Sequence, residues 1–174
     1  RDRLSVENST GTGNTFLVGG NQNNVTTSDL TGLSALTVAL HPTSGVLLVS
    51  SASNTNSTGF AQLSLPAEAT ITAAALTVGG GGSYNGNVGQ VNQLRLGAGA
   101  TVLRVGAVNI GTGIRDLGSV AFAGAAGTLD IRAVDGASAT PFNMGTGTAI
   151  TAVALVSNQN TFDVTGHQAA LKFS

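Results

Sequence analysis

The chain has no cysteine, no tryptophan, one methionine, one tyrosine and three prolines among 174 residues, and only 9% of its residues are charged. Without cysteine it can form no disulfide and offers a metal no thiolate ligand. The low charge argues against a helical bundle, whose exposed faces carry many charged side chains. The seven Lys and Arg residues are scattered and the formal net charge is −1, so nucleic acid finds no basic stripe. No apolar run is long enough to insert into a membrane.

What remains is rich in small and β-prone residues. There are 25 glycines, 41% of residues are hydrophobic, and Ser, Thr, Asn and Ala supply most of the rest. This composition is typical of short strands joined by Gly, Asn and Ser turns. No segment keeps an amphipathic helical stripe over three turns. Strands are predicted over residues 36–40, 46–51, 60–65, 69–78, 90–96, 101–110, 119–123, 128–134, 149–156 and 168–173.

Apolar and polar residues alternate along the predicted strands, which predicts sheets with one buried face. Leu129 and Ile131 share one face of their strand, while Asp130 and Arg132 lie on the other. With turn clusters between short strands, this pattern favours an all-β antiparallel sandwich of jelly-roll type with about 8–10 strands. Gly-Thr-Gly recurs at positions 11, 111 and 145, but at irregular intervals. We find no fixed period, which counts against a β-solenoid.

The first 34 residues differ from the rest in being polar and rich in Asn and Gly. We therefore divide the chain into an extended N-terminal arm, residues 1–34, and a β-sandwich domain, residues 35–174. The apolar anchor of the arm is Phe16, Leu17 and Val18. The arm is either a frayed terminus or a subunit-bridging segment whose anchor docks on a neighbour as an added strand.

A second candidate for subunit contact is the predicted strand over residues 149–156. Ile150 lies on one face of this strand, while Val153 and Leu155 lie on the other. Because both faces are apolar, both should be covered. The cover is either a long loop of the same chain or another subunit.

The search for catalytic chemistry predicts no enzyme. The two histidines, His41 and His167, lie in turns and lack metal-ligand spacing, so we expect no metal and no cofactor. Paired carboxylates, nucleophile elbows and phosphate loops are not recognisable. A sugar ligand, or a calcium ion held by Asp and backbone carbonyls, stays open. Possible glycosylation sites are Asn8, Asn24 and Asn56.

Two resemblances bear on function. The stretch Leu-Pro-Ala-Glu-Ala-Thr-Ile at residues 65–71, with the long strand that follows it, resembles a segment of jelly-roll modules in secreted surface proteins. The whole composition, poor in Lys and aromatics and rich in Gly, Ala, Thr and Asn, resembles that of decoration (cement) and fibre proteins of tailed bacteriophages. The resemblance implies trimers or polymers of small domains packed side by side.

These observations predict a non-enzymatic structural protein of a surface assembly. The first hypothesis is a capsid decoration protein on the virion surface that contacts copies of itself and a major capsid protein. The alternative is a secreted, cell-surface subunit of an extracellular filament or matrix that polymerises by strand donation. A carbohydrate- or protein-binding β-sandwich module is the second alternative.

Overall fold

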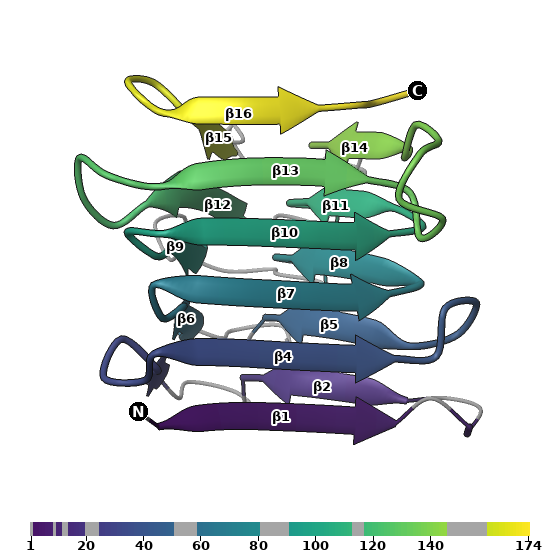
Figure 1. Cartoon of the computed structure of the whole chain (residues 1–174), viewed down its shortest axis with the longest axis horizontal. Coiled ribbons are helices and arrows are strands. Elements are labelled where there is room, and N and C mark those ends of the chain that lie inside the picture. The colour runs from purple at the N-terminus through teal and green to yellow at the C-terminus, as the bar shows by residue number, and fades with distance from the viewer. Residues whose placement is uncertain are drawn as a thin grey trace, which may run out of the picture.

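The chain folds as a parallel β-solenoid, in which successive turns of backbone stack on one another (Figure 1). The computed structural model describes residues 2–8, 10–11, 14–19, 25–50, 59–80, 91–112, 117–145 and 160–174. Within these residues, the strands form three sheets, and each turn adds one strand to each sheet. We call such a turn a coil. Coil 1 contains β1, β2 and β3, and four further coils follow before β16 begins another turn.

The strand bounds follow this order of sheets. The first sheet contains β1 (Arg3–Asn8), β4 (Ala35–Leu40), β7 (Glu68–Ala73), β10 (Ala100–Val105), β13 (Thr128–Arg132) and β16 (Gln168–Leu171). The second sheet contains β2 (Thr15–Val18), β5 (Val46–Val49), β8 (Ala75–Val78), β11 (Val108–Ile110) and β14 (Phe142–Met144). The third sheet contains β3 (Val25–Asp29), β6 (Phe60–Ser64), β9 (Val91–Leu96), β12 (Leu117–Phe122) and β15 (Thr161–Asp163).

The predicted antiparallel jelly-roll sandwich is therefore wrong. Every strand pairing in the described part of the chain is parallel. Alternation reports only that one face of a strand is buried, and a strand lining a solenoid alternates as a sandwich strand does. The all-β class is confirmed, but the arrangement of the strands and the jelly-roll resemblance are not.

The inference that the lack of a fixed period excludes a solenoid is also wrong. Strands of the first sheet begin at residues 3, 35, 68, 100, 128 and 168, so the intervals are 32, 33, 32, 28 and 40 residues. The sequence repeats the placement of apolar residues and not a motif. Intervals vary because the corners between strands differ in length from coil to coil.

The core is a set of aliphatic ladders running through the stack. In the first sheet, Val38, Ile71, Leu103 and Ile131 occupy successive rungs, and each is 0–1% exposed. Equivalent ladders line the other two sheets, so leucine, isoleucine and valine fill the interior. Packing of like side chains in register supplies the close contacts that stabilise a solenoid.

Asparagines and glycines close the coil corners. Asn14, which is 9% exposed, donates from Nδ2 to the backbone oxygens of Asn8 and Gly11 at the corner between β1 and β2. In the third sheet, Asn92 and Gly118 are register partners, and Asn160 directly precedes β15. The Gly118 N–H donates to Asn160 Oδ1 at 2.9 Å. Side-chain amides thus replace ladder bonds where the backbone turns.

Candidate functional site

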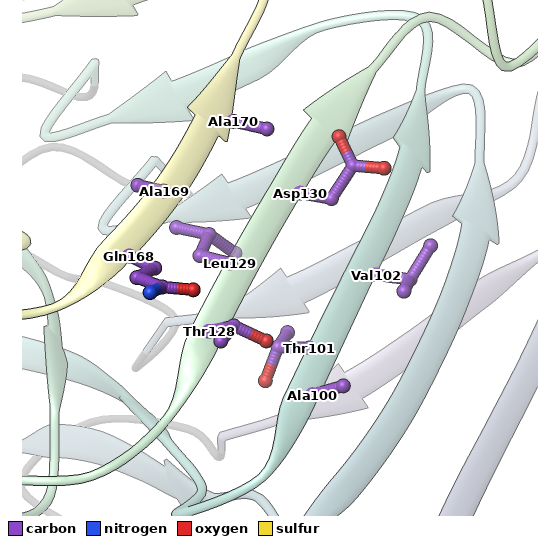
Figure 2. Close-up of a pocket in the computed structure, with 9 residues that line it drawn as sticks. All are labelled: Ala100, Thr101, Val102, Thr128, Leu129, Asp130, Gln168, Ala169 and Ala170. Carbon is purple, nitrogen blue, oxygen red and sulfur yellow. The ribbon is translucent and has the colours of Figure 1, made fainter.

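A shallow groove of about 370 Å³ lies on the first sheet. It crosses β10, β13 and β16, and Figure 2 shows the side chains that line it on these neighbouring strands. The lining residues are Ala100, Thr101, Val102, Thr128, Leu129, Asp130, Gln168, Ala169 and Ala170. The groove offers small side chains, one carboxylate and one carboxamide. It has no aromatic platform for a sugar ring.

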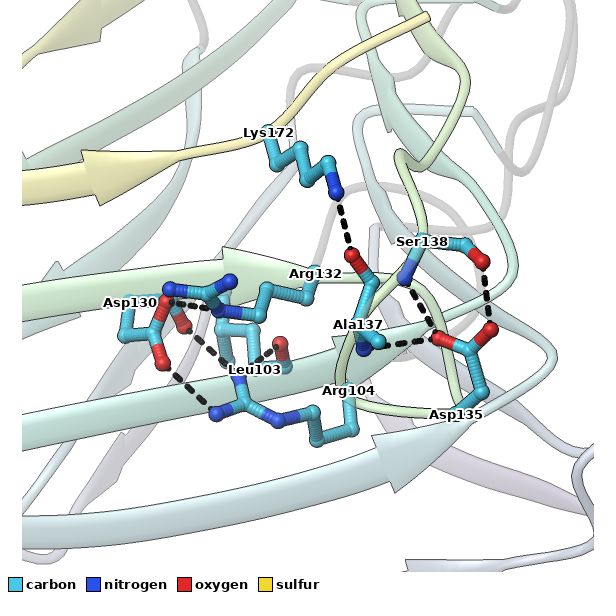
Figure 3. Close-up of polar contacts among 8 residues, drawn as sticks. All are labelled: Leu103, Arg104, Asp130, Arg132, Asp135, Ala137, Ser138 and Lys172. Carbon is cyan, nitrogen blue, oxygen red and sulfur yellow. Dashed lines mark hydrogen bonds and ion pairs between the residues drawn. The ribbon is translucent and has the colours of Figure 1, made fainter.

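The carboxylate of the groove belongs to an ion-pair cluster (Figure 3). Asp130 Oδ2 lies 2.6 Å from Arg104 Nη2, and its Oδ1 lies 3.0 Å from Arg132 Nε. Desolvation raises the pKa of Asp130, but the hydrogen bonds and charges of Arg104 and Arg132 outweigh it, so the pKa falls below its ordinary value. Asp130 is therefore an ionised structural partner of two arginines, without the raised pKa of a general acid.

A second polar cluster forms the corner after β13. Asp135 accepts hydrogen bonds from the backbone N–H groups of Ala137 and Ser138 and from the Ser138 hydroxyl. Lys172, which follows β16, donates to the Ala137 carbonyl (Figure 3). The corner thereby ties the last strand of the first sheet to the preceding coil.

The hydrogen bonds from Ser138 are the main reason that the pKa of Asp135 falls from 3.8 to about 2. Because folding lowers this pKa, the ionised carboxylate stabilises the corner at any pH above the unfolded-state pKa of 3.8. This stabilisation is lost as the pH falls from 3.8 towards about 2. We expect an NMR titration of the Asp135 carboxyl carbon to have its midpoint near 2, and Ser138→Ala to raise it. Ser5→Ala, on the distant β1, should leave it unchanged. A midpoint at the ordinary aspartate value in the unmodified chain would contradict the corner geometry.

Both histidines have structural partners. His41 Nδ1 lies 3.1 Å from the hydroxyls of Thr43 and Ser44 within one turn. The His167 ring stacks on Phe122 with centroids 3.8 Å apart, and its Nε2 lies 2.8 Å from the Gly124 carbonyl oxygen. Over the described ranges, no group of three or more His, Asp or Glu side chains could hold a metal ion. No helix suitable for crossing a membrane occurs in the same ranges.

The structure places the first set of predicted contact residues in β2. Phe16 and Val18 point inward, with Val18 only 4% exposed, whereas Leu17 points outward. The strand pairs in parallel with β5 of the same chain, and residues 3–29 supply the first strand of each sheet. Whether these residues also contact another subunit stays a prediction, as does the division into arm and domain. Ile150, Val153 and Leu155 lie outside the described residues, as do Asn24 and Asn56.

The two ends of the stack are the features that the sequence did not reveal. Among the described residues, five large hydrophobic side chains are exposed, and all belong to the end strands. Leu4, Leu17 and Val25 lie on β1, β2 and β3, one on each strand of coil 1. Met144 and Leu171 lie on β14 and β16 at the other end. Only the stacking order identifies these strands as terminal.

The two ends differ in how the interior is closed. At the C-terminal end, Phe142 of the second sheet packs on Phe162 of the third sheet and on Phe173, which follows β16, with ring centroids 5.3 and 4.5 Å apart. Coil 1 has a single aromatic side chain, Phe16, among its described residues. The aromatic cluster therefore packs against the core at the C-terminal end of the stack. Coil 1 has no equivalent cluster in the part of the chain that is described.

Comparison with known proteins adds no family. No protein-family model, no curated protein and no solved structure matches the chain. Function must therefore be argued from the geometry of the solenoid itself.

Proposed function

We propose that this chain is a non-enzymatic structural module of an extracellular filament or matrix, and that it assembles through the ends of its stack. The observation that carries the proposal is the confinement of the exposed large hydrophobic side chains, among described residues, to the terminal strands. Each end also presents three edge strands, which have one described neighbour apiece. Such edges are templates for pairing with another chain.

The sides of the stack favour the same function. In the outward ladder of the third sheet, Thr27, Gln62, Gln93, Ser119 and Thr161 follow one another. Uncharged polar side chains of this kind repel neighbouring molecules little, which suits close lateral packing in a matrix. Asp130 is tied to two arginines, and Asp29 and Asp135 are tied to turns, which supports scaffolding better than catalysis.

Capsid decoration is the other surface assembly that the composition favours. It differs in its partner, a major capsid protein at a virion surface, and not in the kind of contact. The likeness to decoration proteins is one of composition alone, whereas the exposed apolar residues and edge strands at the ends of the stack favour end-to-end assembly. We therefore place the filament or matrix first.

Sedimentation velocity over a wide concentration range tests the proposal. We expect the purified chain to form oligomers or polymers. Replacing Leu4, Leu17 and Val25 together by lysine should shift it towards smaller species, because buried apolar contact would be exchanged for charge. The matched control is Leu48→Lys, which changes the outward register partner of Leu17 one coil inside the stack.

The control should assemble as the unmodified chain does, and circular dichroism should show both variants folded. A chain that is monomeric at every concentration would contradict the proposal. So would a triple variant that is folded and assembles as well as the unmodified chain.

A further inference from the structure

The edge of β1 carries a self-complementary sequence. Its first five residues read Arg3-Leu4-Ser5-Val6-Glu7, with a cation at one end and an anion at the other. Leu4 and Val6 continue the inward ladders through Leu36 and Val38, while Arg3, Ser5 and Glu7 alternate with them on the outer face. In the described structure β1 pairs with β4 along one edge, and it is the terminal strand of the first sheet.

An antiparallel copy of this strand matches it residue for residue. When Ser5 lies opposite Ser5 of a second copy, Arg3 lies opposite Glu7, and Leu4 lies opposite Val6. Directly opposed residues in an antiparallel pair point to the same face. Both apolar pairs would therefore face the interior, and both charge pairs would lie on the outer surface.

We propose that two copies of this chain dimerise through coil 1, with their β1 strands paired antiparallel about a two-fold axis through Ser5. This inference rests on the proposed function, because it names the partner at one end of the stack. An isologous two-fold contact needs a self-complementary surface, and the Arg3 to Glu7 segment supplies one. The same axis places the coil-1 ends of the two copies against each other. These ends also carry Leu17, which is 49% exposed, and Val25, which is 60% exposed.

Head-to-tail stacking, with β1 following β16 in parallel, fits less well. Continuing the ladder would place Glu7 beside Lys172, which is a favourable pair. However, the first sheet extends one strand further than the other two at the C-terminal end of the described stack. A second copy seated on β16 would therefore leave the second and third sheets one strand short. At the coil-1 end, all three sheets finish at the same coil.

Cysteine cross-linking tests the axis directly, because the chain has no cysteine of its own. Opposed residues in an antiparallel pair have Cα atoms about 4.5–5.5 Å apart, within the range that a disulfide spans. Ser5→Cys should therefore give a disulfide-linked dimer under mild oxidation. The matched control is Thr37→Cys, which stands on the adjacent rung of β4 and should stay uncross-linked.

Charge reversal gives an independent readout. Arg3→Glu or Glu7→Arg alone should raise the dimer dissociation constant about tenfold or more, because each creates two like-charge contacts across the axis. The double variant Arg3→Glu/Glu7→Arg should restore the unmodified value. Lys172→Glu should have no effect on this dimer.

The outcomes separate this inference from the proposed function. If the chain assembles but Ser5→Cys does not cross-link, the two-fold contact is wrong while the proposed function stands. Rescue of Glu7→Lys by Lys172→Glu, without rescue in the Arg3/Glu7 swap, would overturn it in favour of head-to-tail stacking. A monomer at all concentrations would overturn both.

Discussion

Gly118→Ala is expected to lower the free energy of unfolding by about 3 kcal/mol or more, because the added methyl group has no space. A Cβ at Gly118 would lie 2.1 Å from the Val78 carbonyl oxygen and 2.9 Å from the Gly111 nitrogen. Both are backbone atoms, one in β8 and one directly after β11, so they cannot move aside as the end of a flexible side chain could. The close approach occurs where β11 ends and β12 begins, which is why the coil needs glycine there.

Urea denaturation followed by circular dichroism measures this effect. The matched control is Gly124→Ala, since a Cβ at Gly124 meets nothing within 4 Å. The control should change the stability by less than about 0.5 kcal/mol. If Gly118→Ala is as stable as the control, the two sheets do not approach as closely as described here.

Asn92→Leu is the second substitution with a large expected effect. Asn92 is 0% exposed; its Oδ1 accepts from the Ala61 N–H at 2.9 Å, and its Nδ2 donates to the Leu117 carbonyl at 3.1 Å. It therefore bridges coil 2 to coil 4 through the interior. Leucine has a similar size but leaves two buried backbone groups without these partners. We expect a loss of about 2–4 kcal/mol in the free energy of unfolding.

The same denaturation experiment distinguishes the bridge from a general effect of removing asparagine. Asn109→Leu is the matched control, because Asn109 Nδ2 donates to Thr77 Oγ1 on the outer face of the second sheet. Its loss should change the stability by less than about 0.5 kcal/mol. Equal stability of the two variants would argue that Asn92 does not link the coils.

Much of the local structure could be predicted from the sequence. Predicted strands at residues 36–40, 60–65 and 90–96 coincide closely with β4, β6 and β9. Two long predicted strands, 69–78 and 101–110, each contain a corner between two sheets. Ala74 lies in the first corner and Gly106 in the second. Small residues continue a β-prone run without interrupting it, so their role as corners was invisible in the pattern.

The pairing of strands could not be predicted from the same signals. Pairing in a solenoid joins residues about 32 positions apart, and no local feature records that distance. Leu36, Ala69, Thr101 and Leu129 occupy one ladder, yet they share neither size nor polarity. A search for repeated motifs therefore fails, and only the stacked structure gives the register.

Of the exposed apolar residues on coil 1, the sequence singled out only Leu17, and its contact with another subunit stays a prediction. Phe16, Leu17 and Val18 were selected because they form the one apolar run in a polar segment, and they do form a strand of coil 1. Leu4 and Val25 were missed, since each is a single apolar residue among polar neighbours. Their significance depends on being at the end of the stack, which is a property of topology.

The stacking direction also sets how the molecule yields to a mechanical load. The hydrogen bonds between coils run along the axis of the stack, so tension between the two ends acts on one coil boundary at a time. A coil of about 32 residues occupies about 4.8 Å of the axis. The same chain spans about 110 Å when fully extended. Each coil that detaches thus releases some twentyfold its folded length, and a filament built as proposed would lengthen in steps before it breaks.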